Sequence, residues 1–357
     1  MKNIVVAFFW LVAVCLTTQG QTNNQSKAVF LEKISWVEAE KVLKPESVVV
    51  IVLGAQSKQH GPHMPLATDY IQAEYFKNRI AERMDVVIAP SINYSFYPPF
   101  IRYPGSTTLR LSVAREMLMD ICRSLARFGA RRFYVINIGN TTVGALGEAA
   151  NLLKEEGILL RFSDLDKLTG PLRKEISKQE KGTHADEIET SKMLYIAPSL
   201  VNMKKAVKEY GVEGKPRALL PPTNYRSYWQ SGVYGDATLA TREKGKRLVE
   251  AFVEDVVKEI DDLKRAELPK AESLDEIQRN FLGQYEIAPN DVITITAESE
   301  FLAAERVEKP KASMLRSGKY KYGIGLAEAI FFPDASGKIT HMVFSIGERD
   351  FLARKIK

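Results

Sequence analysis

A short polar stretch of the sequence combines residue types that bind metal ions. His60, His63 and Asp69 lie within ten residues of one another, shortly after the β-branched run at 48–53. Neutral imidazole and carboxylate groups are common ligands of zinc and manganese, so this stretch could bind a divalent ion. A structural interpretation is equally open, in which His63 packs or caps a helix and His60 bonds to the backbone.

A second polar segment, residues 183–191, contains His184 and Glu189. Thr183, followed three residues later by Asp186, is typical of a helix start and predicts Thr183 as the N-cap. Glu189 would then lie near the positive end of the helix, which favours the ionised carboxylate. Such a carboxylate suits a metal ion, although it could also serve only as a partner of the helix dipole.

Alternating strands and helices are predicted around these two segments. Continuous apolar runs at 48–53, 86–89 and 132–138 are typical of buried parallel strands. Apolar residues at spacings of three and four predict helices at 70–83 and 113–128. This pattern predicts an α/β fold, a three-layer α/β/α arrangement around a mostly parallel sheet. Ligands of such sheets bind outside the carboxyl ends of the strands, so the chemistry is expected in the loops that follow them.

The C-terminal part of the chain has a different residue pattern. A predicted helix at 242–263 is followed by a proline-containing segment and then by short β-rich runs separated by turns. We therefore predict a large domain at 27–266, a linker at 267–280 and a small β-rich domain at 281–357. The strands of the small domain are expected to be mostly antiparallel, and it offers no cluster of catalytic residue types.

The first twenty residues predict a secretory signal peptide. Lys2 precedes the apolar run Ile4 to Leu16, and small and polar residues follow at 18–20. The run is short for a membrane span, which needs about 20 residues. We expect an exported protein, periplasmic or secreted, with no membrane association after residues 1–20 are removed. A retained N-terminal anchor is the alternative.

The composition is that of an ordinary soluble globular protein, with 45% hydrophobic and 26% charged residues among 357. The formal net charge is +6, but lysines and arginines are interspersed with acids, so no nucleic-acid partner is expected. Without the predicted signal peptide Cys122 is the only cysteine, and an internal disulfide is excluded. Cys122 lies in a helical pattern and is expected to be buried rather than to act as a nucleophile.

The stretch from Lys58 to Asp69 reads Lys-Gln-His-Gly-Pro-His-Met-Pro-Leu-Ala-Thr-Asp. It resembles the signature Glu-Gln-His-Gly-x-His-x-Pro-x-x-x-Asp of the creatininase (creatinine amidohydrolase) family. Four later segments resemble further motifs of that family in the same order: residues 103–107, 128–132, 183–191 and 232–237. On these motifs the chain is identified as a divergent, exported member of the family with an appended C-terminal β domain.

The resemblance implies a creatininase-like fold and a metal-dependent hydrolase of cyclic or linear amides. Members of the family commonly hold two divalent ions bridged by the signature aspartate, and they tend to form homo-oligomers. For this chain the resemblance implies a small-molecule amide substrate, a bridging role for Asp69 and a ligand role for His60. It also implies that Glu189 is a ligand or close neighbour of the metal, and that His184 assists substrate binding or proton transfer.

Two departures from the family pattern change the expected metal site. Lys58 occupies the position of the first glutamate of the signature, and a protonated lysine repels a metal ion. Gly139 stands where the family's Asn-Gly-His-Gly-Gly-Asn turn supplies a histidine, and Thr141 stands where some members have a glutamate. Two neighbouring ions need such ligands to offset their mutual repulsion, so a two-ion centre is not expected.

We therefore predict a single divalent ion, zinc, manganese or iron, bound by His60, Asp69 and Glu189. The ammonium group of Lys58 could take the place of the second ion by pairing with one of the two carboxylates, or it could point to solvent in a site that no longer reacts. The preferred hypothesis is a single-metal amide hydrolase with His184, Glu189 and Lys58 as catalytic residues. The alternative is a secreted ligand-binding pseudoenzyme that keeps the fold without catalysis.

Four residues are predicted to bind the substrate: Asn137, Asn140, His63 and Tyr97. The two asparagines lie at the end of the last predicted parallel strand, where they could orient a substrate carbonyl or simply form a turn. Tyr97 belongs to an aromatic, proline-rich loop that could line a pocket or pack against a neighbouring subunit.

Overall fold

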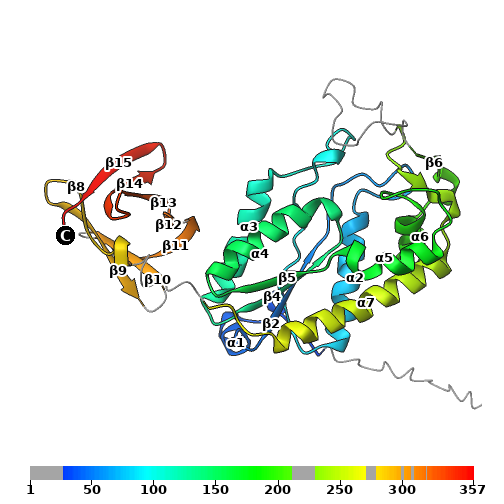
Figure 1. Ribbon diagram of the computed structural model, residues 1–357, viewed down its shortest axis with the longest axis horizontal. Helices are drawn as coiled ribbons and strands as arrows, with labels where there is room; N and C mark the ends of the chain where they lie inside the picture. The colour runs from blue at the N-terminus through cyan, green and yellow to red at the C-terminus, as the bar shows by residue number, and fades with distance from the viewer. Residues whose placement is uncertain (1–26, 211–229, 271–278, 299–300, 307–308, 319) are drawn as a thin grey trace, which may run out of the picture.

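The computed structural model describes residues 27–210, 230–270, 279–298, 301–306, 309–318 and 320–357. These residues form an α/β domain followed by a β-barrel (Figure 1). The predicted signal peptide lies outside the described residues, as does much of the predicted linker. None of the helices in the described ranges is both long and apolar enough to cross a membrane.

The α/β domain is built on a parallel sheet whose edge carries the candidate site. Its strands lie in the order β1 (Val29–Phe30), β3 (Val87–Ile88), β2 (Val48–Leu53), β4 (Arg132–Asn137) and β5 (Leu159–Phe162). Every neighbouring pair in this sheet is parallel. The three strands predicted from apolar runs correspond to β2, β3 and β4. They lie side by side at the centre of the sheet.

Helices cover both faces of the sheet. α3 (Leu111–Ala126) and α4 (Val143–Glu155) lie on one face, and α2 (Thr68–Arg83) and α7 (Arg242–Arg265) lie on the other (Figure 1). The side chains of β2 alternate between the two cores, Val49, Ile51 and Leu53 in one and Val48, Val50 and Val52 in the other. This alternation is what a strand buried on both faces requires. The predicted three-layer α/β/α fold is confirmed.

The remaining elements of this domain are short. They are α1 (Trp36–Val42), α5 (Leu165–Ile176), α6 (Glu187–Ile196) and the antiparallel pair β6 (Lys208–Glu209) and β7 (Gly235–Asp236). The helices predicted at 70–83, 113–128 and 242–263 are present, with ends shifted by at most two residues.

The predicted N-cap of the second polar segment is wrong. α6 begins at Glu187, and its N-cap is Asp186, whose side chain accepts hydrogen bonds from the N–H groups of Ile188 and Glu189. His184 is instead paired with Tyr234 in an antiparallel bridge. The next residue, Ala185, has φ of 48°, a left-handed conformation that delays the helix start. Glu189 nevertheless lies in the first turn of α6, as predicted.

The C-terminal barrel is closed and antiparallel, with its strands in the order β10-β11-β12-β13-β14-β15-β8-β9. Their bounds are β8 Gly283–Ala288, β9 Asp291–Glu298, β10 Phe301–Arg306, β11 Ala312–Gly318, β12 Lys321–Ile324, β13 Ala327–Pro333, β14 Ile339–Ile346 and β15 Arg349–Lys355. Phe281, Tyr285 and Phe331 are among its fully buried core residues. The prediction of a small, mostly antiparallel β-rich domain is confirmed; closure into a barrel goes beyond it.

Candidate functional site

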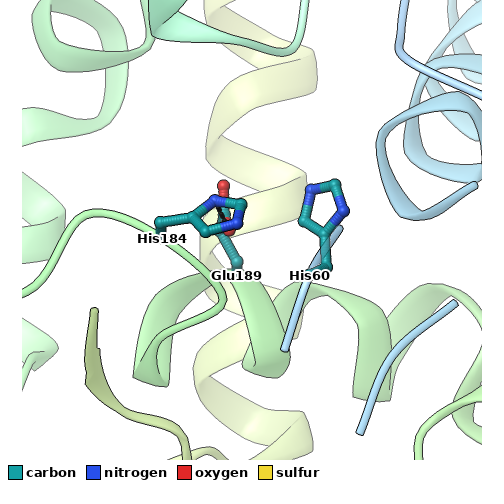
Figure 2. A group of neighbouring side chains, drawn as sticks. All are labelled: His60, His184 and Glu189. Atoms are coloured by element: carbon teal, nitrogen blue, oxygen red, sulfur yellow. Dashed lines mark ion pairs between the residues drawn. The ribbon is translucent and has the colours of Figure 1, made fainter. Parts of the chain in front are cut away.

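Three possible metal ligands meet beside the sheet, in the loops that follow the strands and at the start of α6. His60 comes from the loop after β2, His184 from the segment before α6, and Glu189 from the first turn of α6. One potential ligand atom from each lies within 4.8 Å of the others, and both histidines are buried. Figure 2 shows the three side chains pointing into the same region of the domain.

Backbone carbonyl groups orient both imidazole rings. His60 Nδ1 lies 2.9 Å from the carbonyl oxygen of Lys58, and His184 Nε2 lies 2.9 Å from that of Gln59. A carbonyl oxygen only accepts hydrogen bonds, so these two ring nitrogens carry the protons. The opposite nitrogen of His184, Nδ1, then has the free lone pair of a neutral imidazole. His60 Nε2 lies 2.8 Å from Asp69 Oδ1 and would have to leave that contact to bind an ion. Histidines that bind metals are commonly held in this way by a partner on the other ring nitrogen.

The carboxylate of Glu189 completes a donor set that suits one divalent ion. Its Oε2 accepts a hydrogen bond from the N–H of Ala185 at 2.6 Å and lies 3.4 Å from His184 Nδ1. Two imidazoles and one carboxylate are a common set of protein ligands for a catalytic ion that keeps one position open. This group differs from the predicted metal ligands, which were His60, Asp69 and Glu189. His184 takes the place of Asp69, which lies outside the group.

Asp69 instead pairs with the lysine that replaces the signature glutamate. Lys58 Nζ lies 2.5 Å from Asp69 Oδ2, and His60 Nε2 lies 2.8 Å from Asp69 Oδ1. The rings of Phe100 and Tyr97 flank the ammonium group, with centroids 4.7 Å and 5.6 Å from Nζ. Lys58 is 3% exposed, so the alternative in which it points to solvent is wrong.

Lys58 and the two imidazole rings keep both carboxylates of the site ionised. Burial acts to raise the pKa of Asp69, but the charge of Lys58 and the nearby His60 hold that pKa well below its usual range. Burial likewise acts to raise the pKa of Glu189, but His184, His60 and Lys58 lower it to about 2. Both residues are therefore negatively charged at neutral pH.

A cavity of about 230 Å³ opens beside these groups. Lys58, His184 and Glu189 contribute polar atoms to it. Its apolar lining includes Phe76, Phe100, Ile138, Leu165, Ile188, Leu248 and Phe252. A small cavity with apolar walls and a few converging polar groups is typical of a binding site for a small molecule.

Of the four predicted substrate-binding residues, Asn140 lines this cavity. Asn137 is not among the residues that line the cavity, and its side chain forms a turn: Nδ2 donates to Gly139 O at 2.8 Å, and Oδ1 accepts from the Thr142 hydroxyl at 2.6 Å. The turn interpretation of Asn137 therefore agrees with the structure. No contact here tests its role toward a substrate, which stays a prediction.

His63 and Tyr97 are buried behind the cavity wall. His63 Nε2 lies 2.8 Å from the Thr190 hydroxyl, and burial lowers the pKa of His63 to about 4. Tyr97 is 1% exposed and packs its ring against the Lys58 ammonium group, and burial raises the pKa of its hydroxyl well above 10. Their predicted contact with a substrate stays a prediction. Tyr97 packs against Lys58, which lines the cavity, and His63 contacts Thr190, the residue after Glu189.

Two charged residues of the cavity were not predicted from the sequence. Lys192 follows Glu189 by three residues on α6, and Arg173 lies at the end of the stripe formed by Leu165 and Thr169 on α5. Helical spacing of three or four residues places such side chains on one face. This spacing from Glu189 would have indicated Lys192, whereas the helix that carries Arg173 was not predicted.

The sequence model of one protein family, described as "Creatininase: Creatinine amidohydrolase", matches residues 32–260. The chain is 28% identical over 263 residues to a creatinine amidohydrolase of Pseudomonas putida, a match that covers 68% of this chain and 99% of that protein. It is 29% identical over 225 residues to a mycofactocin precursor peptide peptidase of Mycobacterium tuberculosis, covering 59% of this chain and 84% of that protein.

Solved structures show the same fold. A crystal structure of creatinine amidohydrolase aligns with a TM-score of 0.58 and 24% identity, covering 68% of this chain and 100% of that one. A creatininase variant of zinc type aligns with a TM-score of 0.57 and 25% identity, covering 66% of this chain and 98% of that one. A manganese form of creatininase aligns with a TM-score of 0.56 and 24% identity, also covering 66% of this chain and 98% of that one. The barrel lies outside the residues that the family model matches.

Proposed function

The chain belongs to the creatininase family, and from this premise we propose that it hydrolyses a carbon–nitrogen amide bond with one divalent metal ion. The observation that carries the proposal is the group of His60, His184 and Glu189, whose ligand atoms converge beside a small cavity. The two relatives reported above are named for the hydrolysis of a cyclic amide, creatinine, and of a peptide, so the amide bond is what the substrates of these two share.

His60, His184 and Glu189 would hold the ion, and His60 Nε2 would exchange its contact with Asp69 Oδ1 for the ion. A bound divalent ion of this kind polarises a carbonyl group and lowers the pKa of a water molecule. Zinc or manganese would suit the donors, as would iron. Relative to the sequence-based prediction, the proposed ligand set exchanges Asp69 for His184, because Asp69 is already paired with Lys58.

The other polar groups would bind and orient the substrate and move protons. The Lys58 ammonium group lines the cavity and would stabilise the negative charge that develops on the carbonyl oxygen of the amide. Glu189 Oε2 is anchored by Ala185, and within the described part of the chain its Oε1 has no hydrogen-bond donor. Oε1 is thus placed to accept a proton from the attacking water and to pass it to the leaving nitrogen.

Lys58 would also replace the charge of a second ion. It lies against Asp69, the residue to which the family resemblance gives the bridging role, and one ammonium group there offsets part of the negative charge that a second cation would otherwise neutralise. The proposal therefore predicts one ion per chain rather than two.

Metal analysis of the purified protein, combined with assays on a panel of cyclic and linear amides, tests the proposal. We expect one divalent ion per chain, loss of hydrolysis on chelation and recovery on addition of zinc, manganese or iron. His60→Ala and His184→Ala should each lower metal affinity, and Glu189→Gln should abolish hydrolysis while the fold is kept.

The matched control is His341→Ala, which removes the one histidine of the barrel and should change neither metal content nor hydrolysis. Hydrolysis that is insensitive to chelation, or a protein without stoichiometric metal, would refute the proposed single-metal hydrolase.

The ion pair of Lys58 and Asp69 favours a second candidate function, ligand binding without hydrolysis. The ammonium group already offsets the charge of the Asp69 carboxylate, so that charge does not require a metal ion at this position. A secreted pseudoenzyme would bind small amides with unchanged affinity after chelation and would release no product. The metal analysis and the amide assays separate the two candidates.

We also propose, from the N-terminal sequence and the family resemblance, that the protein is exported and forms homo-oligomers. Cell fractionation and light scattering of the purified protein test these two statements. Recovery in the cytoplasmic fraction, or a monomer across the concentration range used for the assays, would contradict them.

A further inference from the structure

Lys192 lines the cavity without a partner for its charge. Within the described part of the chain its ammonium group forms no hydrogen bond and has no carboxylate within 4 Å. The side chain is half-buried, and burial lowers the pKa of its ammonium group. A cation withdrawn from water usually has an anionic or hydrogen-bonding partner, because the lost hydration must be replaced. The cavity is the side from which such a partner can come.

A bound metal ion would give the cavity an excess of positive charge. Asp69 offsets Lys58 directly, and Arg173 already has an interaction within the chain. Lys192 and Glu189 are the other charged residues among those that line the cavity. An ion held at Glu189 would add positive charge that this one carboxylate does not offset, so the cavity then favours an anionic ligand.

The position of Lys192 fixes where that negative charge would lie. Glu189 and Lys192 are three residues apart on α6 and both line the cavity. Three residues of helix rise about 4.5 Å, so Lys192 is attached to α6 slightly less than one turn beyond Glu189. A ligand with an amide bond at Glu189 would then place a group three or four atoms away within reach of the Lys192 side chain.

We infer that the substrate carries a carboxylate that pairs with Lys192, and that it is a small N-acyl amino acid or a short peptide with a free C-terminus. This inference rests on the proposed amide hydrolysis, to which it adds the class of substrate. Lys192 is a specificity-determining residue in this scheme: it binds the carboxylate, while the groups around Glu189 act on the amide. A cavity of about 230 Å³ limits the substrate to a few residues at most.

The inference is tested with matched pairs of compounds on the full-length protein loaded with metal. Each pair consists of an N-acetyl amino acid, with glycine, alanine or leucine, and the same compound with its carboxylate converted to a neutral amide. Calorimetry measures binding, and acetate release measures cleavage of the bond that both members of a pair share. The variants are Lys192→Met, Lys192→Arg and, as the control, Lys246→Met, which removes an exposed lysine of α7.

We expect the acids to bind the unaltered protein at least about tenfold more tightly than the neutral amides, since a hydrogen bond between charged groups contributes about 1.5 kcal/mol or more. Lys192→Met should remove this preference and leave the affinity for neutral amides within about twofold. Lys192→Arg should keep most of the preference, and Lys246→Met all of it.

Three results would overturn the inference: no preference for the acids, an equal loss of affinity for acids and amides in Lys192→Met, or no binding of any acid in the panel. An equal loss would mean that Lys192 only supports the fold or Glu189. Preferential binding of acids without acetate release would refute the proposed hydrolysis and leave the carboxylate subsite standing.

Discussion

At the scale of single residues, Lys58 changes the character of the site more than any other side chain. It brings a positive charge to a position where the resembled signature has a glutamate, and the structure buries that charge against Asp69 and two aromatic rings. Buried ion pairs contribute little net stability, because both charges lose their hydration. Removal of one partner is costly, because the other is left buried and unpaired.

This asymmetry predicts the behaviour of variants at Lys58 and Asp69. Lys58→Met should lower the free energy of unfolding by about 3 kcal/mol, because the Asp69 carboxylate loses its main partner. Lys58→Met combined with Asp69→Asn should be more stable than Lys58→Met alone. Urea denaturation of the single and double variants measures the coupling, with the exposed pair Arg83 and Glu254 as a control that should show less than about 1 kcal/mol. Additive effects at Lys58 and Asp69 would contradict the pairing.

His63 predicts a pH dependence of stability. Its pKa is lowered to about 4 by burial and by the neighbouring His60, whereas the unfolded chain titrates near 6.5. Between these values the unfolded state binds more protons, so stability falls as the pH falls from about 6.5 to 4, by roughly 3 kcal/mol. Below pH 4 this contribution is lost completely. Urea denaturation of the protein and of His63→Gln at several pH values should show a flatter profile for the variant; identical profiles would contradict the assignment.

At the scale of elements, the packing of α6 on α7 holds Glu189 and Lys192 in place. Gly245 of α7 lies so close to α6 that a methyl group there would be 1.8 Å from the carbonyl oxygen of Ser191. The carboxylate of Glu187, which is fully buried, accepts hydrogen bonds from the backbone of Lys178 and Gln179 and pairs with Lys244 of α7. The first turn of α6 is thereby fixed on two sides.

Two glycine-to-alanine changes test this packing. Gly245→Ala should destabilise the protein by about 2 kcal/mol or more, because rigid backbone has to move, and it should weaken metal binding by displacing Glu189. Gly147→Ala is the matched control: it lies within α4, and an added methyl group meets nothing within 4 Å. It should stabilise the protein by about 0.5–1 kcal/mol through helix propensity. Thermal denaturation and metal titration give both readouts. Equal effects of the two changes would contradict the close contact.

The elements also show what the sequence can predict. β2, β3 and β4 follow from continuous apolar runs, because strands buried on both faces need no alternation of polar residues. β1 was not predicted: it is only two residues long, and its pairing depends on neighbours that a local pattern does not specify. The start of α6 was misplaced because Ala185 adopts a left-handed conformation that favours glycine or asparagine, and its sequence gives no sign of it.

The candidate site was predictable to a similar extent. Residue types and spacing pointed to His60, Asp69, His184 and Glu189, and the structure brings all four together around Lys58. The exchange of His184 for Asp69 in the proposed ligand set depends on hydrogen bonds to two backbone carbonyls. Such contacts arise from tertiary structure and leave no pattern in the sequence.

At the scale of the whole molecule, the barrel meets the α/β domain away from the candidate site. Arg316 of β11 lies 3.8 Å from Glu156, which pairs with Arg123 of α3. A second cavity of about 320 Å³ lies between the two parts and is lined by residues of both. The described barrel residues contribute nothing to the cavity beside Glu189. Within one chain the barrel is therefore not part of the proposed catalytic site.

This separation predicts the effect of removing the barrel. A chain that ends at Lys270 should keep one metal ion and the same KM for any amide substrate, because every proposed ligand and cavity residue precedes that point. Each domain has its own buried core, so the shortened chain should unfold in one cooperative transition. Loss of the ion pair between Arg316 and Glu156 should lower the free energy of unfolding only slightly, since partly exposed ion pairs contribute about 1 kcal/mol or less. Metal analysis, amide kinetics and thermal denaturation check these outcomes. A shortened chain that folds but binds no metal would show that the barrel acts on the site through the α/β domain, because no described barrel side chain reaches it directly.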